Sequence, residues 1–279
     1  MKKYSWMGVL GILGAWVLAV GLLVSGCSAS RSPEAMVQTA SKRLQETKSV
    51  EGTLMTVNTQ ATSRTCAFQW QRDPYQLYFQ LYAQDISVPY GTCYYEQHEG
   101  QLVNYFKSIY NDPEKKQEIW MQEWLTDIQE QAARMEYDPA VLGGALLGGL
   151  EQAKVVGSSK THSGSATQMD GVLQGQALQD VLCNQYFFSS IVRRADRDEE
   201  DAALYEEMGA VPLSIWIDGQ GRLVRARLDV TEAVVRVLGY AEKGEDGKAN
   251  QCYLELNLGN YDRVPAITVP EEAYQGEKV

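Results

Sequence analysis

Residues 64–82 read RTCAFQWQRDPYQLYFQLY, and this stretch decides the fold. Apolar and polar side chains alternate on both sides of the turn signal Arg72-Asp73-Pro74, which is the period of a β-strand with one buried face. The stretch therefore predicts two antiparallel strands with one side toward a core and the other toward water. The expected buried face carries Cys66, Phe68, Trp70, Leu77, Phe79 and Leu81, and the opposite face carries Gln69, Gln71 and Gln80.

Similar alternation extends the predicted sheet along the chain. Turn signals such as Glu99-Gly100 and Gly219-Gln220-Gly221 separate neighbouring segments, so an antiparallel meander is expected. No fixed-period repeat or low-complexity linker divides the chain, and we predict a single domain over residues 33–279. The further predicted strands are 51–60, 92–97, 101–107, 153–160, 165–173, 211–217, 222–229 and 251–258.

Helices are predicted to interrupt and cover this sheet. Capping residues followed by proline mark three helix starts, at Ser32-Pro33, Asp112-Pro113 and Asp138-Pro139. The third helix contains GGALLGG (143–149), an apolar stretch of low helix propensity that fits a movable cover. A polar helical stretch is expected from about Gly175 to Met208. The second helix is expected to carry an apolar stripe of Trp120, Met121, Trp124, Leu125, Ile128, Ala132 and Met135.

The N-terminal segment is typical of a bacterial lipoprotein signal peptide over residues 1–26. A cysteine directly after small residues resembles the lipobox, at which the thiol receives diacylglycerol before cleavage. Residues 27–32 would then form a tether. The alternative is an uncleaved transmembrane anchor, because the apolar run is nearly long enough to span a bilayer. Both interpretations place the chain at the extracytoplasmic face of the cell membrane. The signal consists of Lys2 and Lys3, the apolar run from Trp6 to Val24, Ser25-Gly26 and then Cys27.

Composition argues against a nucleic-acid partner. The 279 residues include 25 Lys and Arg against 36 Asp and Glu, a net charge of -11. Removing the signal with Lys2 and Lys3 leaves 23 basic and 36 acidic side chains, a net charge of -13 over 253 residues. Such a surface disfavours nucleic acid and electrostatic docking onto anionic lipids. We expect a monomer that contacts the membrane through its lipid anchor.

Four cysteines remain when Cys27 carries lipid, and their state is open. Cys66, Cys93, Cys183 and Cys252 allow three pairings, among which sequence cannot choose. Free core thiols and a disulfide are equally consistent with the pattern. No C-x-x-C pair is present, which argues against zinc or thioredoxin-like chemistry.

The sequence lacks the patterns typical of catalysis. His98 and His162 lie in turn-like segments, and no H-E-x-x-H or G-x-S-x-G motif is present. The acidic run at 196–201 lacks the glycine that a calcium loop requires at its sixth position. We therefore predict a protein that is not an enzyme and has no metal or cofactor. A surface hydrolase would need a serine or aspartate beside one of the histidines in a cleft.

Several phrases of the sequence resemble the LolA/LppX-type lipoproteins of the bacterial surface, especially their Gram-positive members. The resemblance covers most of residues 33–273 and includes the order of a helix, a strand meander, amphipathic helices and a second group of strands. The phrases are SVEGTL (49–54), PLSIWID (212–218), LVRARLDVTE (223–232), NYDRV (260–264) and ITVPEEA (267–273).

The resemblance implies an α+β fold, an open antiparallel half-barrel whose concave face is covered by helices above an apolar cavity. Family members with known roles carry lipids or the acyl chains of lipoproteins, and anchorage at Cys27 fits an anchored member better than a free shuttle. We predict that the chain binds or transfers a hydrophobic ligand, a lipid or an acylated molecule. The alternative is an interaction or sensor scaffold with a filled core. The ligand-cavity candidates are Phe68, Trp70, Leu77, Phe79, Trp120, Trp124, Ile128, Leu146 and Leu147, for each of which ordinary core packing is the simpler interpretation.

Overall fold

A computed structural model of the chain describes residues 32–60, 63–83, 87–109, 118–198, 201–244 and 247–279. Residues Pro33–Val279 form one compact unit. The predicted signal peptide and Cys27 lie outside the described residues. Within the described ranges, every helix is too short or too polar to cross a bilayer.

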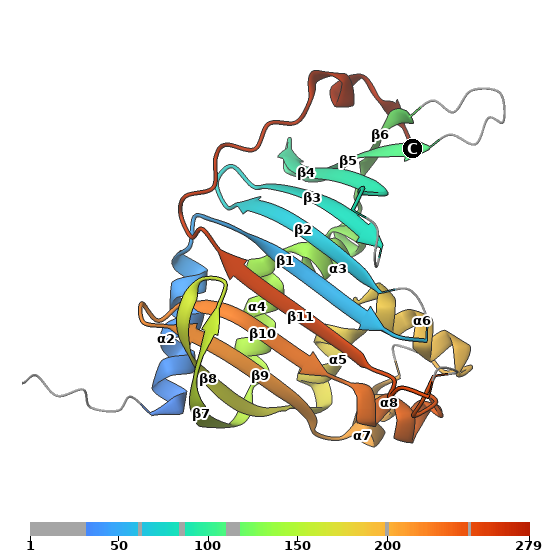
Figure 1. The fold of residues 1–279 in the computed structure, drawn as a ribbon. Helices are drawn as coiled ribbons and strands as arrows, with labels where there is room; N and C mark the ends of the chain where they lie inside the picture. Colours follow the sequence, from blue (N-terminus) through green and yellow to red (C-terminus); the bar gives the residue numbers. More distant parts are fainter. Residues whose placement is uncertain (1–31, 61–62, 84–86, 110–117, 199–200, 245–246) are drawn as a thin grey trace, which may run out of the picture. The chain divides into compact units, whose positions relative to one another are not determined.

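The fold is built on one open, twelve-stranded sheet (Figure 1). Its strand order is β12-β6-β5-β4-β3-β2-β1-β11-β10-β9-β8-β7, and all neighbours are antiparallel except β12 with β6. The strands are β1 (Ser49–Asn58), β2 (Arg64–Gln71), β3 (Gln76–Ala83), β4 (Gly91–His98), β5 (Gln101–Ile109), β6 (Glu118–Trp124), β7 (Glu151–Thr161), β8 (Gly164–Leu173), β9 (Val211–Asp218), β10 (Leu223–Asp229), β11 (Cys252–Gly259) and β12 (Glu277–Lys278).

The α-helices cover one face of this sheet, which we call the inner face; the other face packs against the short 3-10 turn at Glu271–Gln275 instead of an α-helix, and we call it the helix-free face. Figure 1 shows α3, α4 and α5 behind the strands, and α2 alongside the β9–β10 turn. The predicted open half-barrel with a helical cover is therefore confirmed. The helical elements are α2 (Pro33–Glu46), α3 (Asp127–Tyr137), α4 (Pro139–Gly149), α5 (Gly175–Leu182), α6 (Tyr186–Arg194), α7 (Ala202–Met208), α8 (Thr231–Leu238) and the 3-10 turn η1 (Glu271–Gln275).

The inner face is apolar because the alternation read from the sequence is kept across the central strands. Phe68 on β2 is the cross-strand partner of Phe79 on β3, and Trp70 is the partner of Leu77. All four side chains are at most 4 % exposed. They join one contiguous core with the inward residues of the covering helices and of β9, β10 and β11. Burial of this apolar surface is the main driving force for the fold.

The predicted helix beginning at Asp112-Pro113 is wrong over Glu118–Trp124 and confirmed over Asp127–Tyr137. Residues Glu118–Trp124 form strand β6, and the helix α3 begins only after Thr126. Thr126 and Gln129 form a reciprocal capping box that fixes this start. The error has a simple cause: a separation of four residues places Trp120 and Trp124 on one side of a helix and equally on one side of a strand. The residues before Glu118 lie outside the described ranges.

The four cysteines that the structure describes are thiols. Cys66, Cys93, Cys183 and Cys252 are not joined in disulfides. Burial raises the pKa of the Cys93 thiol to about 12, and it raises the pKa of Cys66 and Cys252 further. At neutral pH these three thiols are protonated, and they act as small apolar side chains.

Asp138 begins α4 and provides a pH-dependent prediction. Its carboxylate accepts from the backbone N–H groups of Ala140 (2.8 Å) and Val141 (3.2 Å). Burial nevertheless raises the pKa of this carboxyl above its ordinary value. Ionisation is thus less favourable in the folded state, and the resulting loss of stability develops as pH rises from the unfolded pKa of about 3.9 through the folded pKa.

We therefore expect the stability of Asp138→Asn relative to the wild-type protein to increase from pH 3.5 to pH 7, because asparagine keeps the cap without the buried charge. Asp138→Ala should lose about 1–2 kcal/mol at both pH values, because the cap itself is removed. Guanidinium unfolding of the three proteins at the two pH values tests this. The prediction is contradicted if the stability of Asp138→Asn relative to the wild-type protein falls as pH rises.

Candidate functional site

Six of the nine ligand-cavity candidates lie together on the inner side of the sheet. Phe68, Trp70, Leu77 and Phe79 come from β2 and β3, and Leu146 and Leu147 come from α4. All six belong to the same buried cluster, with exposed fractions from 0 to 4 %. The structure thus brings together side chains that are far apart in the sequence.

The other three candidates do not join them. Trp120 and Trp124 pack on the helix-free face, in a separate cluster with Val103 and Tyr105 and with the C-terminal segment at Val269 and Ala273. The reason is strand register, because Met121 and Leu125 take the inward positions of this part of the chain. The third candidate, Ile128, lies in the first turn of α3, where its side chain is 82 % exposed.

A groove between α2 and the end of α4 lies against the apolar interior. This α2–α4 groove has a volume of about 420 Å³. Leu147 is a member of the buried core and also lines the groove, together with Val37, Leu150 and Ala153. Its rim is polar, with Gln38 and Lys42 from α2 and Gln152 from β7.

Glycines in α4 differ in their surroundings near this groove. A Cβ atom at Gly143 would lie 2.9 Å from Leu44 Cδ2, so this glycine lets α4 approach α2 closely. At Gly148, which lines the groove, a Cβ atom would meet nothing within 4 Å. The low-propensity stretch predicted from sequence therefore has two roles, close packing at one end and open space at the other.

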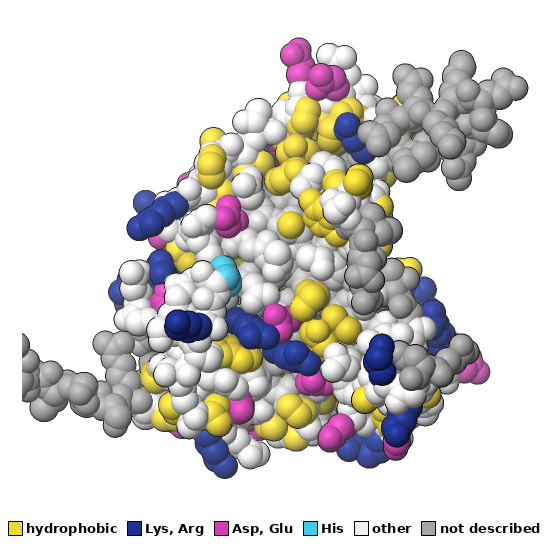
Figure 2. All heavy atoms as spheres, viewed as in Figure 1, with side chains coloured by type: hydrophobic (Ala, Val, Ile, Leu, Met, Phe, Trp, Pro, Cys, Tyr) yellow, Lys and Arg dark blue, Asp and Glu magenta, His cyan; other side chains and the backbone are white. Residues whose placement is uncertain are grey.

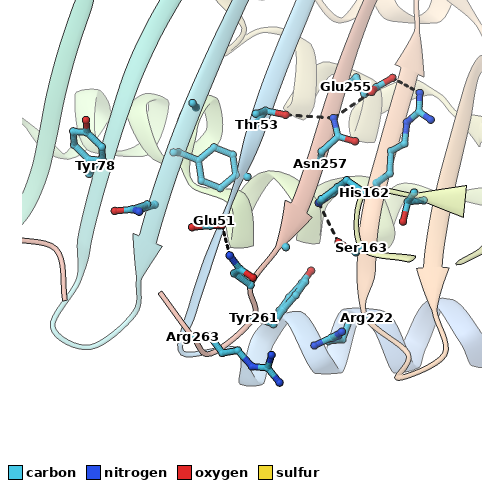
Figure 3. Close-up of a pocket in the computed structure, with 18 of the residues that line it drawn as sticks. Glu51, Thr53, Tyr78, His162, Ser163, Arg222, Glu255, Asn257, Tyr261 and Arg263 are labelled. Carbon is cyan, nitrogen blue, oxygen red and sulfur yellow. Dashed lines mark hydrogen bonds and ion pairs between the residues drawn. The ribbon is translucent and has the colours of Figure 1, made fainter. Parts of the chain in front are cut away.

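A larger groove of about 1070 Å³ lies on the helix-free face, and we call it the outer groove. Its floor is formed by β11, β1, β2 and β3, and one wall is the tip of the β7–β8 hairpin. Figure 3 shows Glu51, Thr53 and Asn257 between Tyr78 on one side and His162 and Ser163 on the other. Figure 2 shows Lys and Arg side chains gathered beside a histidine on this face.

The hairpin tip is fixed onto β11 through Ser163. The Ser163 hydroxyl donates to the Leu258 carbonyl at 3.1 Å, and its oxygen lies 3.0 Å from His162 Nε2. With its proton directed to the carbonyl, the Ser163 oxygen can accept from His162 in the tautomer that carries a proton on Nε2. This is the reverse of the arrangement that a serine nucleophile and its general base require. The pair therefore has a structural role, which is to hold the hairpin tip on β11.

The outer groove could not be predicted from the sequence. Its lining comes from β1, β2, β3, β10, β11 and the β7–β8 tip, and no local motif marks it. The only available signal was the amide-rich polar face of the strands, which is also typical of ordinary solvent exposure. Among the described residues, no group of three or more His, Cys, Asp or Glu side chains could hold a metal ion.

The geometry defines the class of fold as an open half-barrel of the LolA/LppX type. A solved structure, the lipoprotein LppX of Mycobacterium tuberculosis, matches with a TM-score of 0.50 and 12 % identity, over 85 % of this chain and 98 % of that chain. The predicted resemblance is thereby confirmed at the level of fold.

Two further solved structures are similar at lower scores. LprF from Mycobacterium bovis has a TM-score of 0.47 and 14 % identity, over 86 % of this chain and 97 % of that chain. The MucA/MucB complex of Pseudomonas aeruginosa has a TM-score of 0.36 and 12 % identity, over 86 % of this chain and 62 % of the matched chain. No family model and no curated protein matches this chain in sequence.

Proposed function

We propose that this chain is a lipid-anchored extracytoplasmic lipoprotein that binds a hydrophobic ligand, a lipid or an acylated molecule, without catalysing a reaction. The lipobox-like sequence ending at Cys27 supports the anchor and the location. The fold shared with the lipoprotein LppX is consistent with both. The region from Pro33 would act as a single domain and a monomer beside the membrane.

The observation that carries the ligand proposal is that Leu147 belongs both to the buried core and to the lining of the α2–α4 groove. A volume of about 420 Å³ lies within the usual range of small-ligand sites, about 300–1,000 Å³. We propose that an acyl chain enters here and continues toward Leu146 and the inner face of the sheet. Each methylene removed from water would contribute about 0.8 kcal/mol, so an apolar site is sufficient for binding.

Filling the groove should remove the ligand. Gly148→Trp places an indole in the open space at this position, and we expect ligand occupancy to fall at least about tenfold, since overpacking a site costs about 1–3 kcal/mol. The full chain is extracted in mild detergent, and its native mass is compared with its denatured mass. The difference reports non-covalent ligand separately from the covalent anchor.

Gly148→Ala is the matched control, because it adds one methyl group at the same position without closing the groove. It should keep the ligand and, as a helix-favouring change, slightly raise the thermal midpoint. Equal occupancy in the tryptophan and alanine variants would place the ligand elsewhere. A wild-type protein with equal native and denatured masses and no uptake of a fluorescent fatty acid would refute ligand binding.

The second candidate function is a non-enzymatic interaction or sensor scaffold with a filled core. It is favoured by the burial of Phe68, Trp70, Leu77 and Phe79, each at most 4 % exposed among neighbouring side chains. In that case the helical cover is a permanent part of the core. The same mass comparison separates the two functions, because a scaffold carries no ligand in either variant.

A further inference from the structure

The charges around the outer groove leave basic side chains available to a ligand. Arg222 forms an ion pair with Asp218 at 2.6 Å, and Arg225 forms one with Glu255 at 2.6 Å. Lys160, near the hairpin tip, also lines the groove.

Arg263, which follows β11, is the fourth cation of the lining. Within the described part of the chain, neither Lys160 nor Arg263 has an acidic partner within 4.0 Å. One carboxylate of the lining, Glu51, also lacks a basic partner there, and it accepts from the Asn260 amide. The groove is therefore locally basic on a chain of net charge -11, and it favours a ligand with negative charge.

Neutral polar groups in the same groove favour a ligand that also has hydroxyls. The Asn257 amide donates to Thr53 Oγ1 (3.4 Å) and Glu255 Oε1 (3.2 Å), which directs its carbonyl oxygen as an acceptor (Figure 3). The Gln80 carbonyl oxygen accepts from Tyr82 at 2.9 Å, and its amide remains a donor. A simple anion offers only acceptors and would meet repulsion from Glu51, whereas a hydroxyl both donates and accepts.

An aromatic ring stands at the edge of these groups. Tyr78 lines the groove and is the direct cross-strand partner of Gln69 on β2 and of Tyr94 on β4. The rings of Tyr78 and Tyr94 have centroids 4.8 Å apart, so a second aromatic ring lies beside Tyr78 at this edge. The apolar C–H face of a sugar ring packs well on such a ring.

We propose that the outer groove binds an acidic saccharide, a chain of sugar rings that carry both carboxylate groups and hydroxyls. Lys160 and Arg263 would bind the carboxylates, Asn257, Gln80 and Glu51 the hydroxyls, and Tyr78 the face of a ring. This site is on the opposite face from the α2–α4 groove, and it is independent of the proposed lipid-like ligand.

The position of the groove disfavours a peptide added as a strand. Such peptides bind at the edge of a sheet, where backbone groups are unpaired. The floor of the outer groove is formed by β11, β1, β2 and β3, which are central strands with partners on both sides. Recognition must therefore come from side chains, as in the arrangement above.

Calorimetric titration of the full chain in zwitterionic detergent tests the proposal, with trigalacturonic acid, neutral maltotriose and inorganic phosphate as probes. Trigalacturonic acid should bind, and Lys160→Gln with Arg263→Gln should weaken it about tenfold, because two charge-assisted contacts are lost. The matched control, Lys154→Gln with Lys243→Gln, removes the same charge at exposed positions outside the groove and should bind normally. Ala67→Trp, which fills the floor without changing charge, should abolish binding.

Four results would overturn the proposal. The first is that trigalacturonic acid fails to bind the wild-type protein. The second is that both double variants weaken its binding equally, which would indicate general charge attraction. The third is that maltotriose or phosphate binds as tightly as the acidic saccharide. The fourth is that the Ala67→Trp variant, shown to be folded by its thermal transition, binds normally. None of these results affects the proposed hydrophobic ligand, which is measured by mass on Gly148 variants.

Discussion

Replacing Gly52 by valine is expected to lower the free energy of unfolding by about 3 kcal/mol or more, the upper range for overpacking. A Cβ atom at this position in β1 would lie 1.9 Å from the backbone carbonyl oxygen of Asn257 in β11 and 3.0 Å from Phe68 Cζ. The carbonyl belongs to a paired central strand and cannot turn away as a side chain would. The two strands must therefore separate, and guanidinium unfolding measures the cost.

Gly91→Val is the matched control, because it makes the same change in another strand of the sheet. The nearest atom to a Cβ at Gly91 is Leu81 Cδ1 at 3.3 Å, the flexible end of a side chain. We expect this variant to lose less than about 1 kcal/mol. Similar losses for the two variants would mean that the close approach of β1 and β11 is not what requires glycine.

The second large effect is expected at the ion pair that joins the sheet to its helical cover. Arg64 Nη2 on β2 lies 2.5 Å from Glu136 Oε1 on α3, and the two side chains are 14 % and 16 % exposed. Arg64 also lies over the rings of Tyr137 and Tyr186. Arg64→Met should destabilise the protein by about 3 kcal/mol, because it leaves Glu136 as a nearly buried charge without its partner. Urea or guanidinium unfolding gives the value.

Two variants identify the origin of that loss. Arg64→Met combined with Glu136→Leu should recover much of it, since replacing both members of a buried pair by apolar side chains removes the unpaired charge. Arg197→Met breaks a more exposed pair with Glu207, whose side chains are 31 % and 52 % exposed, and should cost less than about 1 kcal/mol. The interpretation fails if Arg64→Met costs no more than Arg197→Met.

The sheet could be predicted because its alternation is local and strong. Cys66, Phe68 and Trp70 keep one face from sequence to structure, and the register that pairs Phe68 with Phe79 continues it across two strands. The antiparallel strands were therefore within reach of pattern alone, whereas the open half-barrel was implied by the resemblance of short phrases such as 49–54 and 223–232 to a known family.

Two parts of the molecule could not be predicted from local pattern. Trp120 and Trp124 satisfy both helical and strand periods, and only the register with β5 decides that they face away from the core. The outer groove depends on the hairpin tip at His162 and Ser163 reaching β11, a contact between residues nearly a hundred positions apart. Such a site exists only once the topology is complete.

The central position of β11 in the sheet makes folding of the chain depend on its last strands. Leu54 and Leu256 are direct partners, although about 200 residues separate them. Until β11 docks, β1 and β10 both present bare backbone edges in the middle of the future sheet. Pairing at this range slows folding and prolongs exposure of those edges. A chain that emerges with its N-terminus first therefore remains prone to aggregation until its last tenth, which contains β11, has emerged. A chaperone that binds extended strands would protect the chain during that interval.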